Sequence, residues 1–301
     1  MVLFKKKRDV LLKKIKWCLG CGNYSILYQL SKVLEDLKEK KERTIIVSGI
    51  GCSSRLPYFI KLNSIHSIHG RAFSIATGII LSNPKLNVWV ITGDGDSFSI
   101  GLNHLLHTIR RNINIKILIV NNGVYALTKG QYSKTYYNSN NNNSFNIISL
   151  MLSAGATFIA RTLDSNPIHI RKILKKANNH KGTSCIEIIQ NCPIFNNIKD
   201  KINNILYLKN KYPLVYSKKK GIILIKNIPK IINYKNNKNI WIHNETDIYK
   251  SYILSNFFYI NKNLPIPFGI FFRVKSKNKN KIKYKKQHQK LSCIFHKNFI
   301  I

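Results

Sequence analysis

The sequence predicts an α/β fold built around a parallel sheet, and three observations support this prediction. Short apolar runs typical of buried strands alternate with segments whose apolar residues recur every three to four positions, as in helices. Most of the apolar runs end in a loop that contains glycine, asparagine or aspartate. The chain has 301 residues, of which 44% are hydrophobic, so it can bury a large core without disulfide bonds. Alternating strands and helices form parallel sheets that bind ligands at the carboxyl ends of their strands.

The predicted elements follow one another closely along the first two thirds of the chain. Helical spacing of apolar residues predicts helices at 24–38, 72–81, 103–111 and 168–178. Continuous apolar runs predict strands at 44–48, 87–92, 115–120, 157–160 and 184–189. The second helix is expected to end before Asn83-Pro84, because proline disfavours helical backbone at the residue before it. The asparagine-rich stretch 138–144 has no periodicity and is expected to be a flexible loop.

Composition divides the chain into four parts. A basic N-terminal segment covers 1–16, and a main ligand-binding domain is expected over 17–200. Beyond it the chain becomes rich in lysine, asparagine and isoleucine, which indicates a small basic C-terminal region over 201–272. The last part, 273–301, is a basic tail that we expect to be poorly ordered.

The charge is strongly positive, with 50 Lys and Arg against 12 Asp and Glu and a formal net charge of +38. Such an excess is typical of proteins that bind nucleic acid. However, the lysines lie among asparagine, isoleucine and tyrosine, all encoded by AT-rich codons, so we favour a biased genome composition over a polyanion-binding role. No stretch reaches the ~18 apolar residues of a membrane span, and 1–16 does not resemble a secretory signal. A cytoplasmic location is expected.

Four of the six cysteines lie in glycine-rich or proline-flanked turns: Cys18, Cys21, Cys52 and Cys192. Such a set suits a metal held by four thiolates from different loops, and both zinc and an iron–sulfur cluster fit the pattern. The alternative is a pair of thiols with two buried cysteines of no special role. Cys185 lies within a predicted strand and Cys293 within the basic tail, so we assign neither as a ligand.

Polar side chains follow two neighbouring predicted strands. Gly93-Asp94-Gly95-Asp96 follows the strand at 87–92, and Asn121-Asn122-Gly123 follows the strand at 115–120. A carboxylate and a side-chain amide at adjacent strand ends can bind Mg²⁺, while the glycines allow backbone amides to approach a diphosphate. A plain structural turn would explain either motif alone, but not both together.

These motifs together resemble a known family. Gly-Asp-Gly followed one helix and one strand later by Asn-Asn resembles the motif of thiamine-diphosphate enzymes. Three further motifs resemble those of the beta subunits of 2-oxoacid:ferredoxin oxidoreductases, most closely the 2-oxoglutarate type. They are Trp17-Cys-x-Gly-Cys-Gly, Ser-Gly-Ile-Gly-Cys-Ser-Ser-Arg at 48–55 and His69-Gly-Arg-Ala. The resemblance extends over about 17–196 and implies a thiamine-diphosphate-binding domain of the pyrophosphate type.

The resemblance implies a role for each matching position. It implies that Cys18, Cys21, Cys52 and Cys192 hold one four-iron four-sulfur cluster. It implies that Mg²⁺ is bound by Asp94, Asn122 and the main-chain carbonyl of Val124. The positions that match those beside thiamine diphosphate are Ile50, Gly51, Cys52, Ser53, His69, Gly95, Asp96 and Ala126. His69, Leu127 and Lys129 are expected to take part in the reaction itself.

Lys129 bears on the choice of substrate. A cation near the reacting carbon can pair with the distal carboxylate of 2-oxoglutarate. Members of the family with Thr-Lys-Gly-Gln, as found here, resemble the 2-oxoglutarate type, whereas Thr-Gly-Gly-Gln is more usual for pyruvate. The alternative is a lysine that pairs only with the cofactor or with a neighbouring subunit. Two positions depart from the family: Leu19 replaces a usual proline, and Ala126 replaces a usual glycine whose backbone could require positive φ.

The implied function is the oxidative decarboxylation of a 2-oxoacid with coenzyme A, with electrons passing through the cluster to ferredoxin. Thiamine enzymes also need a carboxylate that activates the aminopyrimidine, and this chain offers no convincing candidate, so the resemblance implies an alpha subunit as partner. Two other classes remain open: a nonoxidative thiamine-dependent decarboxylase, and a basic zinc protein that binds nucleic acid.

Overall fold

The computed structural model describes residues 15–136, 144–198, 202, 204–217, 219–234 and 239–275. Most of the basic N-terminal segment, residues 138–143 of the asparagine-rich stretch, and most of the basic tail, including Cys293, lie outside the described residues.

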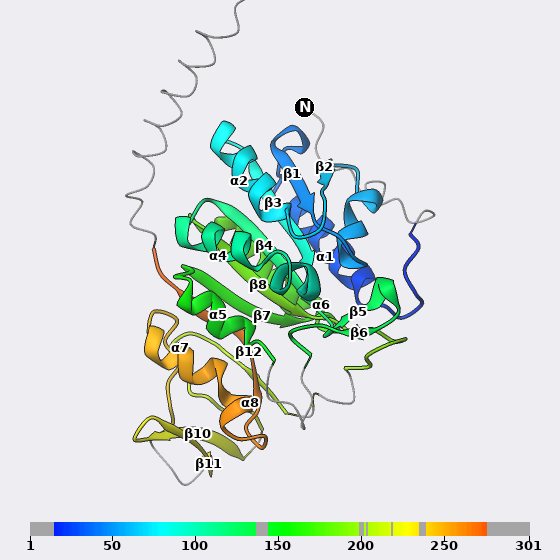
Figure 1. The fold of residues 1–301 in the computed structure, drawn as a ribbon. Helices are drawn as coiled ribbons and strands as arrows, with labels where there is room; N and C mark the ends of the chain where they lie inside the picture. The colour runs from blue at the N-terminus through cyan, green and yellow to red at the C-terminus, as the bar shows by residue number, and fades with distance from the viewer. Residues whose placement is uncertain are drawn as a thin grey trace, which may run out of the picture.

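An eight-stranded sheet forms the centre of the protein, with strand order β2-β1-β3-β4-β8-β7-β12-β9 (Figure 1). Its strands are β1 (Thr44–Ser48), β2 (Asn63–His66), β3 (Asn87–Gly93), β4 (Ile115–Asn121), β7 (Phe158–Leu163), β8 (Ser184–Ile189), β9 (Ile205–Tyr207) and β12 (Ile266–Arg273). All neighbouring pairs are parallel except β12 with β7, which is antiparallel. The predicted α/β fold with a mostly parallel sheet is therefore confirmed.

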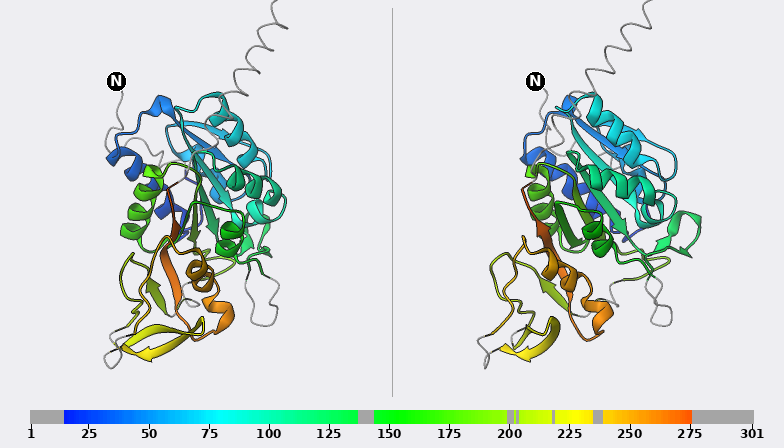
Figure 2. Two further views of the ribbon diagram at one scale, coloured as in Figure 1. Left: turned by 90° about the vertical axis from the view of Figure 1, so that its left-hand side faces the viewer. Right: turned by 60° about the vertical axis from the view of Figure 1, so that its left-hand side comes forward.

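Helices cover both faces of this sheet (Figures 1 and 2). On one face lie α1 (Asn23–Asp36) and α6 (Pro167–Asn179), and on the other lie α2 (Ala72–Ser82), α4 (Leu102–Arg111), α5 (Ile147–Ser153) and α7 (Ile248–Ser255). The start of α6 shows why a helix forms there: the side chain of Asn166 accepts a hydrogen bond from the His169 backbone amide, and proline occupies the first turn. None of the described helices is long and apolar enough to cross a membrane.

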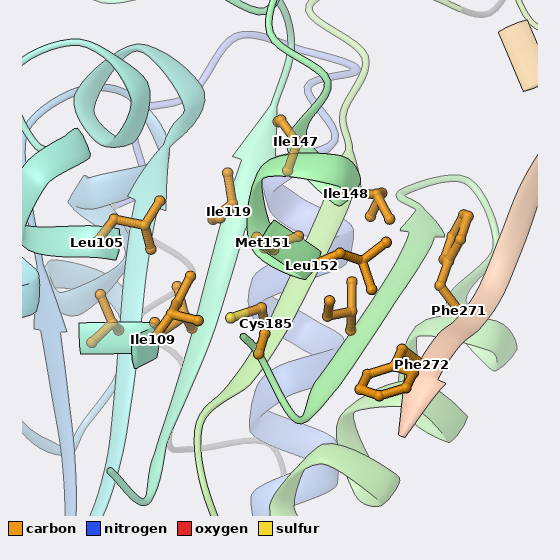
Figure 3. Packing of buried hydrophobic residues seen from close by; sticks show 14 of the residues in the cluster. Leu105, Ile109, Ile119, Ile147, Ile148, Met151, Leu152, Cys185, Phe271 and Phe272 are labelled. Atoms are coloured by element: carbon orange, nitrogen blue, oxygen red, sulfur yellow. The ribbon is translucent and has the colours of Figure 1, made fainter. Parts of the chain in front are cut away.

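The strand side chains alternate between two separate cores. In β4, Ile117 and Ile119 pack on the α4 and α5 side, whereas Leu118 and Val120 pack on the α1 and α6 side. Figure 3 shows part of the first core, where Ile119 lies between Leu105 of α4 and the residues of α5. Because both faces are buried, these strands are continuous apolar runs in the sequence, which is why they could be predicted.

Short elements follow the carboxyl ends of the strands. The 3-10 turn η3 (Ser53–Phe59) comes shortly after β1, and α3 (Asp94–Phe98) begins directly after β3. β5 (Val124–Tyr125), the 3-10 turn η4 (Ala126–Thr128) and β6 (Gln131–Tyr132) follow β4 in turn. A further 3-10 turn, η2 (Lys41–Arg43), precedes β1. The motifs singled out in the sequence lie in or beside these short elements.

The part of the chain after residue 200 contains structure that the sequence did not predict. β10 (Lys220–Ile225) and β11 (Ile228–Asn233) form an antiparallel hairpin, and α8 (Phe257–Ile260) follows α7. Strand β12 then returns to the central sheet beside β7. The domain boundary near residue 200 stays a prediction, but the sheet draws strands from both sides of it.

Candidate functional site

A cavity of about 120 Å³ lies at the carboxyl ends of β1, β3 and β4. Twelve of the residues singled out from the sequence line it: Ile50, Gly51, Cys52, Ser53, His69, Asp94, Gly95, Asp96, Asn122, Val124, Ala126 and Leu127. The parallel sheet explains this convergence, because the loops after neighbouring strands meet at one edge.

Lys129 is not among the lining residues, although Thr128 beside it is. It is exposed and closes the η4 turn, with its backbone amide donating to the Ala126 carbonyl at 3.3 Å. Its φ is +74°, in the left-handed region that a lysine rarely adopts. Ala126 is not among the described residues with positive φ, so the alanine that replaces the usual glycine is compatible with the backbone there.

Asp94 is the first residue of α3 and is only 2% exposed. Its carboxylate accepts hydrogen bonds from the hydroxyls of Ser133 and Thr135, the latter at 2.6 Å, and from the Asn122 backbone amide. Burial raises the pKa of Asp94, while these hydrogen bonds lower it. A buried carboxylate of this kind is stabilised by a nearby cation.

Asn122 lies beside Asp94 and is held by three further contacts. Its Oδ1 accepts from the Val124 backbone amide at 3.1 Å, and its Nδ2 donates to Gln190 Oε1 at 2.9 Å. Its carbonyl oxygen accepts from Asn196 Nδ2 at 2.7 Å. The Asp94 carboxylate and the Asn122 amide oxygen supply the hard oxygen donors that Mg²⁺ prefers, so the donor chemistry fits this ion.

Asp96 holds the loop after β1. Its Oδ1 accepts from the backbone amides of Gly70 and Ile50 at 2.8 and 3.3 Å and contacts His69 Nδ1, while its Oδ2 accepts from the Thr92 hydroxyl at 2.7 Å. The approach is so close that a Cβ at Gly49 would lie 1.8 Å from Asp96 Oδ2. Although Asp96 lines the cavity, its carboxylate is therefore turned toward protein donors, and it fixes the orientation of the His69 ring.

The four cysteines of the candidate cluster site lie on three loops that are tied together. The Cys21 backbone amide donates to the Cys18 carbonyl at 3.1 Å, which closes the first turn. Trp17 Nε1 donates to the Cys52 carbonyl at 2.7 Å, and the Gly22 amide donates to the Asn191 carbonyl at 3.3 Å. The tryptophan of the Trp-Cys-x-Gly-Cys-Gly motif thus joins the first cysteine turn to the loop of Cys52.

Electrostatics shows that the four thiols are neighbours. The pKa of Cys21 is raised to about 11, mainly by burial and in smaller part by the charges of Cys192, Cys52 and Cys18. The pKa of Cys52 is likewise raised by burial first and then by Cys192 and Cys18. Thiolates gathered in this way repel one another unless a cation compensates them.

Four sulfur donors fit an iron–sulfur cluster. Among the described residues, no three or more His, Cys, Asp or Glu side chains converge closely enough to hold a single metal ion. A cluster of four irons spaces its cysteines more widely than one zinc ion, which binds each sulfur at about 2.3 Å. Cys185 lies elsewhere, on β8, with its side chain fully buried in the core (Figure 3). Burial alone raises the pKa of its thiol.

The sequence did not reveal several residues that organise the site: Ser133, Thr135, Gln190 and Asn196. Each acts on a residue far away in the chain, as Ser133 does on Asp94. The only available signal was position, because Gln190 and Asn196 flank the Cys192 turn and Ser133 and Thr135 follow the Thr-Lys-Gly-Gln loop.

Comparison with known proteins adds to this geometry. Residues 49–188 match the family described as thiamine pyrophosphate enzyme, C-terminal TPP binding domain. The chain is 39% identical over 189 residues to 2-oxoglutarate synthase subunit KorB of Methanocaldococcus jannaschii, an alignment that covers 60% of this chain and 70% of that protein. The chain belongs to the beta subunits of the 2-oxoacid:ferredoxin oxidoreductases.

This beta subunit is also 48% identical over 193 residues to 2-oxoglutarate oxidoreductase subunit KorB of Mycobacterium tuberculosis, an alignment that covers 61% of this chain and 52% of that protein. It therefore spans about half the length of that relative. A solved structure of 2-oxoglutarate:ferredoxin oxidoreductase from Magnetococcus marinus, with 2-oxoglutarate, coenzyme A and succinyl-CoA bound, is similar with a TM-score of 0.75 and 28% identity, covering 93% of this chain and 89% of that chain. The family predicted from the sequence is thus confirmed.

Proposed function

We propose that this beta subunit binds thiamine diphosphate, Mg²⁺ and one four-iron four-sulfur cluster, and that with an alpha subunit it oxidatively decarboxylates a 2-oxoacid. The acyl group passes to coenzyme A and the electrons pass to ferredoxin. One observation carries the proposal: Cys52, one of the four gathered cysteines, lines the same cavity as Asp94 and Asn122. Electron removal needs a redox centre beside the reacting carbon, and this arrangement supplies a place for one.

The Mg²⁺ ligands in this proposal are Asp94, Asn122 and the Val124 carbonyl, and Gly95 lies beside Asp94 in the lining of the cavity. A thiamine diphosphate bound there would supply carbanion and electron-sink chemistry for decarboxylation. Asp94 and Asn122 would hold the Mg²⁺ ion at the diphosphate end of the cofactor. The loop 50–53 and Leu127 form walls of the cavity.

His69 is the one histidine among the described residues that line the cavity. Its Nδ1 faces the Asp96 carboxylate, so Nε2 points away from that partner. The Asp96 contact favours the tautomer with a proton on Nδ1, which leaves Nε2 as an acceptor. We assign His69 the movement of protons at the substrate end of the cavity.

The preferred substrate in this proposal is 2-oxoglutarate, converted to succinyl-CoA. Lys129 at the rim supports this choice, as does the similarity to subunits named for 2-oxoglutarate and to the structure with 2-oxoglutarate and succinyl-CoA bound. Pyruvate is the competing substrate.

The proposal includes an alpha subunit because of the acidic residues that line the cavity. Among the described residues that line the cavity, Asp94 and Asp96 are the acidic ones, and both carboxylates are engaged by protein donors. The carboxylate that activates the aminopyrimidine must therefore come from a partner chain. The beta subunit purified alone is expected to show no turnover, and turnover without a partner would contradict this part of the proposal.

The test is anaerobic co-expression with the alpha subunit, followed by assays of ferredoxin and viologen reduction in the presence of coenzyme A. Faster reduction with 2-oxoglutarate than with pyruvate supports the proposal, together with a cluster signal in electron paramagnetic resonance. Preference for pyruvate would contradict the substrate assignment alone. A protein without iron that still decarboxylates would overturn the oxidative function.

A further inference from the structure

Gln190 lies between the candidate cluster site and the candidate Mg²⁺ site. It follows β8 directly, is 1% exposed, and is not among the residues that line the cavity. Its Oε1 accepts from Asn122 Nδ2 at 2.9 Å, and its Nε2 donates to Cys21 Sγ at 3.4 Å and to the Asn191 carbonyl. One side chain therefore contacts a cysteine of one site and a ligand residue of the other.

The orientation of this amide is fixed by the backbone. The Val124 amide can only donate, and it donates to Asn122 Oδ1 at 3.1 Å. The NH₂ group of Asn122 must then face Gln190, so the oxygen of Gln190 accepts and its own NH₂ group faces the Cys21 sulfur. The direction of the N–H···S contact thus follows from a donor that cannot be reversed.

The two sites are also joined by contacts that do not depend on the Gln190 side chain. The Gln190 backbone amide donates to the Asn121 carbonyl at 2.8 Å, and Asn196 Nδ2 donates to the Asn122 carbonyl at 2.7 Å. Asn196 in turn exchanges two backbone hydrogen bonds with Cys192. A substitution that keeps the length of the Gln190 side chain therefore removes the bridge while the loops keep their backbone anchors.

We propose that Gln190 is a positioning residue that couples the cysteine cluster to Asn122 and through it to the Mg²⁺ and diphosphate site. This inference rests on the proposed function. A hydrogen bond to a cluster sulfur stabilises the reduced, more negative cluster and raises its midpoint potential. On its other side, the same amide keeps the Asn122 oxygen directed at the metal ion, as outer partners of metal ligands do. Each site then influences the other, and the influence is reciprocal.

The test compares Gln190→Met with Gln29→Met in the anaerobically purified complex of alpha and beta subunits. Gln29 is also a buried glutamine, 5% exposed, but it lies in the middle of α1 away from both sites. Redox titration followed by electron paramagnetic resonance gives the midpoint potential of the cluster. Calorimetry gives the Mg²⁺ concentration that half-saturates thiamine diphosphate binding.

Gln190→Met is expected to lower the midpoint potential and to weaken Mg²⁺ binding by roughly 10- to 100-fold, whereas Gln29→Met leaves both unchanged. If Gln190→Met changes only the midpoint potential, only Mg²⁺ binding, or neither, the coupling would be overturned. If Gln190→Met fails to fold, Gln190→Glu provides the second arm, because it keeps an acceptor for Asn122 and lacks the donor to Cys21. It should retain Mg²⁺ binding while lowering the potential, and an unchanged potential would contradict the inference. A wild-type complex without a cluster signal or Mg²⁺-dependent cofactor binding would instead contradict the proposed function.

Discussion

Lys129 holds a left-handed backbone conformation, with φ of +74°, at the rim of the cavity. A non-glycine residue pays of order 1 kcal/mol for such a conformation, and strain of this kind persists where function requires the side chain. Lys129→Gly removes this strain but adds freedom to the unfolded chain, so we expect the free energy of unfolding to change by less than about 1 kcal/mol. The ratio of kcat/KM for 2-oxoglutarate over pyruvate should fall at least tenfold, because the cation proposed to pair with the distal carboxylate is lost. Equal losses on both substrates would show that Lys129 serves the cofactor instead.

Cys21 carries a thiol whose pKa burial raises from its ordinary value of 9.0 to about 11. Only the thiolate reacts with iodoacetamide. In the chain without a bound cluster, iodoacetamide should therefore alkylate Cys21 at pH 8 roughly 100-fold more slowly than a simple peptide thiol. The rate should rise about tenfold per pH unit up to pH 10, since the thiolate fraction does so below the pKa. Mass spectrometry of the peptide that contains Cys21 measures this rate. A rate equal to that of the peptide thiol would mean that Cys21 is not buried in the protein without its cluster.

Strand β12 extends the central sheet beyond β7 from the far end of the chain. Phe271 of this strand is fully buried (Figure 3). Arg161 of β7 lies over its ring at 5.4 Å. Phe271→Ala is expected to lower the free energy of unfolding by about 3–5 kcal/mol, because it leaves a cavity between the strand and its covering helices. Ile228→Ala on β11 is the matched control, since Ile228 is 55% exposed and should change stability by less than about 0.5 kcal/mol. Chemical denaturation of both variants checks the difference.

The elements that could be predicted from the sequence are those defined by local pattern. The runs that became β3 and β4 are apolar throughout because both their faces are covered, and α1 shows its buried face at regular spacing. β12 is an apolar run as well, but its antiparallel place beside β7 depends on a partner more than a hundred residues earlier in the chain. At the candidate site, too, contacts between residues distant in the chain could not be predicted from local pattern. Asp94 and Asn122 follow predicted strands, whereas the hydroxyls of Ser133 and Thr135 reach Asp94 only through the turn of β5 and β6.

The whole molecule carries a formal net charge of +38, and the proposed electron acceptor is an acidic protein. Opposite charges accelerate encounter between proteins, and salt screens this effect. If the charge steers ferredoxin, KM for ferredoxin should rise several-fold between 50 and 300 mM NaCl, while the reduction of a small viologen changes less than twofold. Steady-state assays of the complete complex with both acceptors measure this. Equal salt effects on both acceptors would indicate that the charge reflects genome composition and has no role in docking.

The parallel sheet also determines when the four cysteines can meet. Cys18 and Cys21 precede α1, Cys52 follows β1, and Cys192 follows β8, which lies in the middle of the sheet between β4 and β7. The ribosome synthesises the first three long before the last, and Cys192 is brought to them by β8, which pairs with β4 and β7. With the proposed ligands, iron can enter only a chain whose sheet is already assembled. If the proposed cluster binds, a chain truncated before Cys192 should lack a complete cluster site.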